Sequence, residues 1–263
     1  MDIPVKGVII DRVRLLEDMR ASSGAETICD SVIDVSRCDE GYTVRCTGGE
    51  FSCRYLVGAD GGFSIVRKRF FVSTVGLRSA VVNNLVKGDS DTDVLEFQVS
   101  TKYPGAYRWD FPSKDGFRSI GYEIGTDDIP EADESGFRYI VCGRADAIAD
   151  GNCCLVGDAA LMNNPICYSG IGAALLSGKK AAESIAEDNL AHYAKWKNGN
   201  ILFDRHFMEA AVTFRAWGEE EYADAVKPFR KGYSVWRGVY AVLRRPKWAN
   251  IYISIWQAFR KCW

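Results

Sequence analysis

The stretch that decides the fold is Gly58-Ala59-Asp60-Gly61-Gly62-Phe63-Ser64-Ile65-Val66-Arg67, which directly follows an apolar, strand-like segment. Glycine lets a backbone turn tightly and come close to a ligand. The short helix expected from Ser64 to Phe70 would present free N–H groups to an anionic oxygen. Asp60 can accept hydrogen bonds from hydroxyl groups. The stretch therefore predicts a ligand-binding strand–turn–helix unit, with a plain structural corner as the alternative.

A second glycine-containing turn follows later in the chain. Gly157-Asp158-Ala159-Ala160 comes after the apolar strand expected at Cys153–Val156, and a loop then opens a helix expected over Gly170–Glu187. Small residues on that helix allow it to pack closely on a sheet or on a cofactor. Tight helix–sheet packing is the alternative, and it explains the alanines but not the Gly-Asp pair at the strand end.

Taken together, the two turns resemble the flavoprotein hydroxylase and reductase superfamily, in which both segments contact FAD. The first matches the superfamily pattern at Gly58, Ala59, Asp60, Gly61, Ser64, Val66 and Arg67. The second matches it at Gly157, Asp158, Ala159, Ala160, Pro165, Gly170, Ile171, Ser177, Gly178, Ala181 and Ala182. The resemblance implies FAD as the cofactor. The residues that it assigns to cofactor binding are Arg12 (in an Asp11-Arg12 pair), Gly58, Asp60, Gly61, Gly157, Asp158, Pro165, Gly170, Ile171 and Gly172.

A third segment, Tyr107-Arg108-Trp109-Asp110-Phe111-Pro112, resembles the signature of the geranylgeranyl reductase family. The resemblance implies an FAD-dependent oxidoreductase that reduces carbon–carbon double bonds in the isoprenoid chains of lipids. Tyr107, Trp109, Phe111 and Pro112 would then form an apolar surface for the prenyl chain. Cys167 is the candidate catalytic residue, and the external reductant, NADPH or ferredoxin, stays open. A half-buried strand with ordinary aromatic packing is the alternative.

The sequence departs from the family in several places. It contains no G-x-G-x-x-G, the loop that holds the FAD diphosphate at a helix N-terminus, since Gly170-Ile171-Gly172 lacks the third glycine. Leu161 stands where the family usually has glycine, and Cys167-Tyr168-Ser169 where it usually has Thr-Gly-Gly. We therefore expect the chain alone to bind FAD weakly or not at all. It would be a truncated product, or half of a split enzyme whose second chain supplies the nucleotide-binding unit.

The order of expected elements predicts an α/β fold with three parts. Residues 1–72 and 145–190 form a partial, Rossmann-like FAD-binding domain, residues 73–144 a β-rich substrate domain, and residues 191–263 a helical C-terminal region. Within the first part we expect a strand at Val5–Ile10 and another at Thr27–Val35. A hairpin is expected from Tyr42–Cys46 and Phe51–Val57.

Composition and charge limit the kinds of protein that this sequence can encode. The 263 residues are 47% hydrophobic and 26% charged with a formal net charge of −2, which excludes a disordered chain and gives no indication of nucleic-acid binding. None of the nine cysteines forms a C-x-x-C pair, so we expect no metal site. The first residues lack the pattern of a signal peptide, and we expect a cytoplasmic protein.

The C-terminal segment 227–263 differs from the rest in charge. It holds nine basic residues, no acidic residue and four tryptophans. This combination favours an anionic membrane surface. The helix expected over Trp248–Lys261 has only a narrow polar stripe, so it either lies in a membrane interface or packs on the protein core.

Two functions other than the prenyl reductase remain open from the sequence. One is a cofactor-free homologue that serves as a lipid-binding or partner-binding module, which the absent G-x-G-x-x-G and the Tyr168-Ser169 pair favour. The other is a flavin monooxygenase of the same superfamily that acts on aromatic rings.

Overall fold

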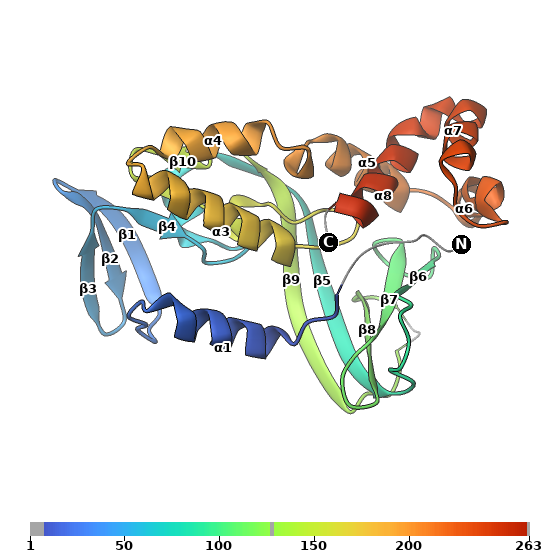
Figure 1. Ribbon diagram of the computed structural model, residues 1–263, viewed down its shortest axis with the longest axis horizontal. Helices are drawn as coiled ribbons and strands as arrows, with labels where there is room; N and C mark the ends of the chain where they lie inside the picture. Colours follow the sequence, from blue (N-terminus) through green and yellow to red (C-terminus); the bar gives the residue numbers. More distant parts are fainter. Residues whose placement is uncertain (1–7, 127–128, 262–263) are drawn as a thin grey trace.

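The computed structural model describes residues 8–126 and 129–261, and it has an α/β architecture built on three sheets (Figure 1). The strands are β1 (Val32–Cys38), β2 (Gly41–Cys46), β3 (Gly49–Cys53), β4 (Leu56–Gly58), β5 (Ser73–Lys87), β6 (Glu96–Val99), β7 (Tyr107–Pro112), β8 (Phe117–Glu123), β9 (Glu134–Ala145), β10 (Ala149–Asp150) and β11 (Cys153–Leu155). The α-helices are α1 (Arg12–Ser23), α2 (Ile65–Phe70), α3 (Ile171–Ala186), α4 (Leu190–Asn198), α5 (His206–Arg215), α6 (Glu219–Val226), α7 (Val235–Arg244) and α8 (Ala249–Lys261). The predicted fold class is confirmed.

The smallest sheet places the two glycine turns beside each other. Strands β4 and β11 pair in parallel, with Leu155 opposite Gly58, and β10 pairs antiparallel with β11. The amide of Val156 continues the ladder by donating to the carbonyl of Gly58 at 3.0 Å. Because parallel strands end at the same edge of a sheet, the turns after β4 and β11 lie side by side at that edge.

The largest sheet has five antiparallel strands in the order β6-β7-β8-β5-β9. Its long strands β5 and β9 pair from Ser73 opposite Ala145 to Leu85 opposite Glu134, with one irregularity between Val75 and Leu77. Figure 1 shows this pair running from the small parallel sheet to the far end of the molecule. The segment 73–144, expected to be rich in β-structure, forms this sheet.

The third sheet, β1-β2-β3, confirms one local expectation and corrects two. Strands β2 and β3 do form the predicted hairpin, with Tyr42 opposite Cys53. The predicted strand Phe51–Val57 is instead two strands, since β3 ends at Cys53 and β4 begins at Leu56 in another sheet. The period-2 pattern persists across this bend, so it could not mark the change of sheet. The strand expected at Thr27–Val35 begins only at Val32.

The first core of the molecule lies under the small parallel sheet. Cys153, Cys154 and Leu155 of β11 are fully buried, and Tyr193 of α4 donates a hydrogen bond to the Leu155 carbonyl at 2.7 Å. Burial raises the pKa of Tyr193. This packing holds the end of β11, and with it the second glycine turn, in a fixed position.

A second core joins the C-terminal helices. Phe207 of α5, Trp217, Trp248 and Ile251 are buried in one cluster, and Ser254 and Ala258 of α8 are fully buried. Helix α8 is therefore packed on the protein, as the docked-helix alternative predicts. Of the helices in the described ranges, each is too short or too polar to cross a membrane.

Helix α1 contrasts with both cores because none of its residues is buried. Asp11 caps its start by accepting from the amides of Val13 and Arg14, and Gly24 ends it at a positive φ of 65°. The strand expected at Val5–Ile10 is wrong over Val8–Ile10, which has no regular structure, and its residues 5–7 lie outside the described ranges.

Candidate functional site

One large cleft of about 3170 Å³ runs between the glycine turns, the five-stranded sheet and the C-terminal helices. A small-molecule pocket usually measures roughly 300–1,000 Å³, so this cleft has room for a dinucleotide and a long apolar ligand together. The predicted site residues that line it are Arg12, Gly61, Tyr107, Trp109, Phe111, Pro112, Gly157, Asp158, Cys167, Gly170, Ile171 and Gly172. Gly58, Asp60 and Pro165 are not among the lining residues.

In the first turn, Asp60 serves the following helix. Its carboxylate accepts hydrogen bonds from the amides of Ile65 at 2.6 Å and Val66 at 3.4 Å, and the residue is exposed. Gly58 is required for packing, because a Cβ there would lie 2.8 Å from Leu155 and from Val66. Of the three cofactor candidates in this turn, only Gly61 faces the cleft.

Arg67 connects the two turns to each other. Its guanidinium donates to the carbonyl of Ala159 in the second turn at 2.7 Å and to that of Gly62 in the first at 2.5 Å. The residue is only 3% exposed. The sequence pattern included Arg67 without giving it a role. The structure shows that it cross-links two turns separated by about ninety residues.

The second turn carries a carboxylate into the cleft. Gly157 has a φ of +54° and donates its amide to Ser177 Oγ at 2.9 Å, which ties the turn to α3. Burial raises the pKa of the neighbouring Asp158, while a hydrogen bond from Asn163 and the charge of Arg138 act in the opposite direction. Asp158 is therefore a partly buried acid that faces this cleft.

This burial gives a pH-dependent prediction for Asp158→Asn. In the unfolded chain the carboxyl ionises near pH 4, whereas the folded chain retains the proton to a higher pH. The ionised group thus lowers stability once the pH exceeds the raised pKa, and it has no such effect below about pH 4. We expect the variant to have a larger free energy of unfolding than the wild type at neutral pH, and the gain to vanish in acid.

Urea unfolding of both proteins across this pH range measures the difference. The exposed Asp39→Asn in the β1–β2 turn is the control, and it should change little at any pH. A gain for Asp158→Asn that is the same in acid and at neutral pH would contradict the prediction.

The N-terminus of α3 opens onto the same cleft. Gly170 precedes the helix with no side-chain cap, and Gly170, Ile171 and Gly172 all line the cavity. A Cβ on Gly170 would lie 2.2 Å from Asn163 Oδ1, so any larger residue there would have to displace the Asn163 side chain. An uncapped helix start attracts negative charge through its free N–H groups and the helix dipole.

Two departures from the family pattern keep the backbone shape that glycine favours. Leu161 has a φ of +58° and Tyr168 a φ of +53°, and both stand where the family usually has glycine. Each left-handed residue costs about 1–2 kcal/mol. Tyr168 offsets this cost with hydrogen bonds from its hydroxyl to Glu123 at 2.9 Å and with Ser79 at 2.8 Å.

Glu123, Arg215 and Ser79 form a polar cluster behind Tyr168 that the sequence did not indicate. Arg215 Nη2 lies 3.1 Å from Glu123 and donates to Ser79 Oγ at 3.1 Å. Its guanidinium also lies 5.4 Å from the centre of the Tyr168 ring. The cluster joins α5, β5 and β8, so no local pattern could have revealed it. It fixes the ring of Tyr168 at the border of the cleft.

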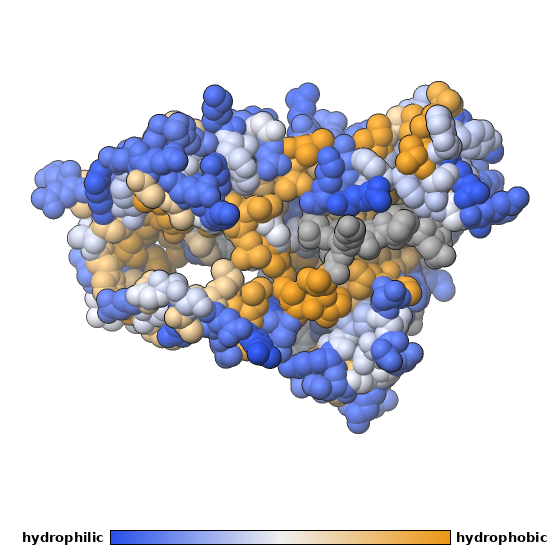
Figure 2. Space-filling model, in the orientation of Figure 1, coloured by the Kyte–Doolittle hydropathy of each residue, from blue (hydrophilic) through white to orange (hydrophobic). Residues whose placement is uncertain are grey.

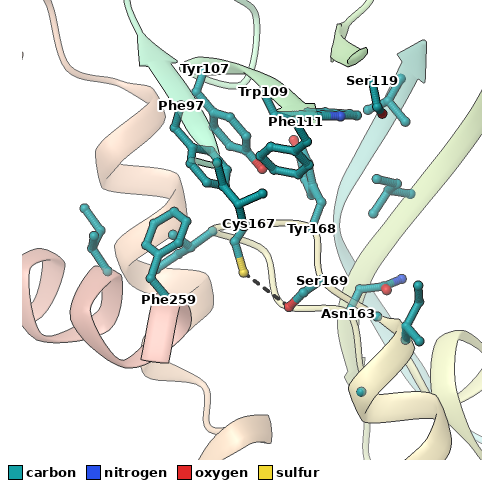
Figure 3. Close-up of a pocket in the computed structure, with 18 of the residues that line it drawn as sticks. Phe97, Tyr107, Trp109, Phe111, Ser119, Asn163, Cys167, Tyr168, Ser169 and Phe259 are labelled. Atoms are coloured by element: carbon teal, nitrogen blue, oxygen red, sulfur yellow. Dashed lines mark hydrogen bonds between the residues drawn. The ribbon is translucent and has the colours of Figure 1, made fainter. Parts of the chain in front are cut away.

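Aromatic rings cover one side of the cleft, and Figure 3 shows those of Phe97, Tyr107, Trp109 and Phe111 above Cys167 and that of Phe259 beside it. Tyr107, Trp109 and Phe111 share one face of β7, as their period-2 spacing requires. Phe97 of β6 and Phe259 of α8 complete the group, with ring centres 4.7 Å apart. We call these five residues the aromatic wall. Phe97 lies on the neighbouring strand and Phe259 on the C-terminal helix, so the β7 pattern gave no indication of either.

Trp109 lies directly over Gly121 on the neighbouring strand. The two residues are opposite each other in the β7–β8 ladder, and a Cβ on Gly121 would lie 1.8 Å from the indole ring. The indole Nε1 donates to Asn83 Oδ1 at 3.2 Å. Because position 121 is glycine, the Trp109 ring can lie close against β8, and this sets how far the aromatic wall stands back from the cleft.

Two polar atoms in this apolar region remain protonated at neutral pH. Burial raises the pKa of Tyr107 well above its ordinary value, and its hydroxyl has no hydrogen-bond partner among the described residues. Burial also raises the pKa of Cys167, whose Sγ lies 3.2 Å from Ser169 Oγ (Figure 3). An unpaired buried hydroxyl is unfavourable unless a ligand satisfies it.

Comparisons with known proteins give relatives in sequence and neighbours in fold. No family model matches the chain. Digeranylgeranylglycerophospholipid reductase 3 of Methanosphaera stadtmanae is 26% identical over 277 residues, covering 86% of this chain and 69% of the relative. Digeranylgeranylglycerophospholipid reductase 2 of Methanothermobacter thermautotrophicus is 27% identical over 215 residues. The chain spans 56% of that relative's length.

Solved structures share the fold. A geranylgeranyl bacteriochlorophyll reductase-like protein of Thermoplasma acidophilum matches with a TM-score of 0.69 and 19% identity, over 90% of this chain and 73% of the other. HpxO of Klebsiella pneumoniae, solved with FAD and uric acid, matches with a TM-score of 0.57 and 14% identity, over 92% and 72% of the two chains. The resemblance to the geranylgeranyl reductase family, and a fold shared with FAD-dependent flavoproteins, are confirmed.

Proposed function

We propose that this chain is an FAD-dependent reductase of carbon–carbon double bonds in the isoprenoid chains of lipids. The observation that carries the proposal is the position of the aromatic wall, which borders the same cleft as the second glycine turn and the open start of α3. The two reductases described above are named for a digeranylgeranyl phospholipid, which agrees with a long apolar ligand in a cavity of this size.

The residues present fit the flavin end of FAD. Gly61, Gly157, Asp158 and the uncapped α3 start at Gly170 would hold it, because they offer close backbone approach, a carboxylate for hydroxyl groups and N–H donors for anionic oxygen. FAD, when bound, supplies the hydride for the reduction. Arg12, on α1 at the cleft, would add positive charge near the diphosphate.

The chain's own residues orient the alkene and exclude water from it. The aromatic wall offers apolar rings to a prenyl chain, and Trp109 is fixed in place by Asn83 and Gly121. Cys167 is the candidate catalytic residue, since its protonated thiol lies among the lining residues beneath the wall (Figure 3). Tyr107 presents a hydroxyl in the same region that a ligand would satisfy.

A cofactor-free lipid-binding module is the second candidate. The sequence has no G-x-G-x-x-G, and a tyrosine stands at position 168, where the family usually has glycine. Both candidates share the apolar cleft and differ in whether a flavin binds beside it.

Flavin retention and product analysis separate the two candidates. The purified chain is incubated with FAD, desalted and measured for flavin absorbance. It is then supplied with NADPH, reduced ferredoxin or dithionite and a geranylgeranylated phospholipid. The reductase predicts bound flavin and lipid products that have gained hydrogen at their double bonds. A chain that binds the lipid but neither retains FAD nor reduces the lipid under any of the three reductants would establish the module instead.

A further inference from the structure

Helix α7 presents its apolar side to solvent. Only Ala241 of this helix is buried. Val235, Val239 and Leu243 follow one line along the helix with Trp236 and Tyr240 beside it, on the side opposite Ala241. Trp236 is 82% exposed and Leu243 75%. We call these five exposed residues the α7 face, and Figure 2 shows apolar side chains at this end of the molecule.

This orientation is the reverse of an ordinary surface helix, which turns its apolar stripe toward the core. Contiguous exposed apolar patches in folded proteins usually mark a binding surface. The α7 face gathers a tryptophan, a tyrosine and three aliphatic side chains, which is the composition of helices that lie in the boundary between lipid headgroups and acyl chains.

The charge around α7 favours an anionic lipid surface. Between residues 219 and 247 there are four acidic and seven basic residues, so this region carries 7 − 4 = +3. Asp224 pairs with Lys227 and Arg245 of the same region, so these contacts leave its net charge unchanged. Arg230, Lys231 and Lys247 are exposed. Glu219 is held by the hydroxyl and amide groups of Ser100 and Thr101.

The α7 face is also continuous with the cleft. Val235, Val239 and Leu243 of the face line the cavity, as do Gly238 and Val242 of the same helix. An apolar path therefore leads from the exposed side of α7 to the aromatic wall without crossing a charged rim on this helix.

We propose that α7 lies flat in the headgroup region of a bilayer that contains anionic phospholipids, and that a membrane lipid passes its prenyl chain into the cleft beside α7. The proposed membrane docking rests on the exposed α7 face and on the positive charge around it. The passage of the prenyl chain rests on the proposed function. Helix α8, the other apolar helix of the basic tail, packs on the core through Ile251 and Ala258 and leaves α7 as the docking element.

Vesicle flotation tests the docking with the full chain. The probes are phosphatidylcholine vesicles with and without phosphatidylglycerol. We expect binding to the anionic vesicles, and at least about tenfold weaker binding for Trp236→Ser/Leu243→Ser, because two large apolar side chains no longer enter the interface. The matched control is Val72→Ser/Ile129→Ser, which removes two exposed apolar side chains elsewhere and should bind like the wild type.

Three outcomes overturn the docking. They are no binding of the wild type to anionic vesicles, equal loss in both double variants, and vesicle binding unchanged by Trp236→Ser/Leu243→Ser. If that variant instead converts a dimer to a monomer in analytical ultracentrifugation with unchanged vesicle binding, the face is a contact between copies of the chain.

An activity comparison separates lipid entry from the proposed function itself. We expect Trp236→Ser/Leu243→Ser to reduce a prenyl lipid in detergent micelles at the wild-type rate and to lose at least about tenfold when the lipid is embedded in vesicles. Equal rates in vesicles would overturn the entry route. A wild type without activity in either form would refute the proposed function and leave the vesicle-binding result standing.

Discussion

Gly121→Ala is expected to reduce prenyl-lipid reduction by about a hundredfold, the usual effect of displacing a positioning group by an ångström. A Cβ at this position would lie 1.8 Å from the Trp109 ring, so the indole must move toward the cleft. That movement breaks its hydrogen bond to Asn83 and occupies the volume meant for the substrate. Overpacking of this kind also lowers the free energy of unfolding by roughly 1–3 kcal/mol.

Gly136→Ala on β9 is the matched control for this prediction. It lies in the same sheet and faces the same cleft, but a Cβ there would approach only the Asn83 carbonyl, at 3.9 Å. Steady-state rates and near-ultraviolet circular dichroism, which reports the tryptophan environment, should change for Gly121→Ala and stay near wild type for Gly136→Ala. Full activity in Gly121→Ala would show that the depth of the aromatic wall does not matter.

Arg67→Ala is expected to destabilise the protein by about 3 kcal/mol and to abolish flavin retention. The buried guanidinium donates to carbonyls in both turns, and its removal leaves Gly62 and Ala159 with unsatisfied oxygens. A loss of this size is a large share of the 5–15 kcal/mol that stabilises an ordinary domain. The two turns would also lose the link that fixes their separation.

Arg69→Ala on the same helix is the control, because Arg69 is exposed. Urea unfolding measures stability, and flavin fluorescence after desalting measures retention. If Arg67→Ala matches Arg69→Ala in both measurements, the cross-link between the turns has no energetic role. Loss of stability with normal flavin retention would restrict Arg67 to a structural role.

The parts of the fold that local sequence encodes were predictable. The two glycine turns follow β4 and β11, and parallel pairing of these strands brings the turns together. The period-2 aromatics of β7 lie on one face, as expected. Each turn, and the shared face of the β7 aromatics, depends on residues within one short segment.

What depended on contacts between distant segments was not predictable. Asp60 was expected to meet a ligand, yet its carboxylate caps α2, and Arg67 makes the long-range contacts instead. A hydrophobic pattern identifies the apolar side of a helix but not what covers that side. The narrow polar stripe of the helix at Trp248–Lys261 therefore suggested a membrane contact there, whereas the solvent-exposed apolar face belongs to α7.

The ladder between β5 and β9 limits how the cleft can open. These two strands of the five-stranded sheet lead the chain away from the first glycine turn and back toward the second, and they pair with each other from Ser73 opposite Ala145 onward. A hinge needs a few residues that can change their backbone angles freely, whereas the ladder pairs both strands along their length except at the irregularity between Val75 and Leu77. We therefore expect ligands to enter and leave the cleft through movement of the helices around it. The paired strands that connect both halves of the site should keep their arrangement.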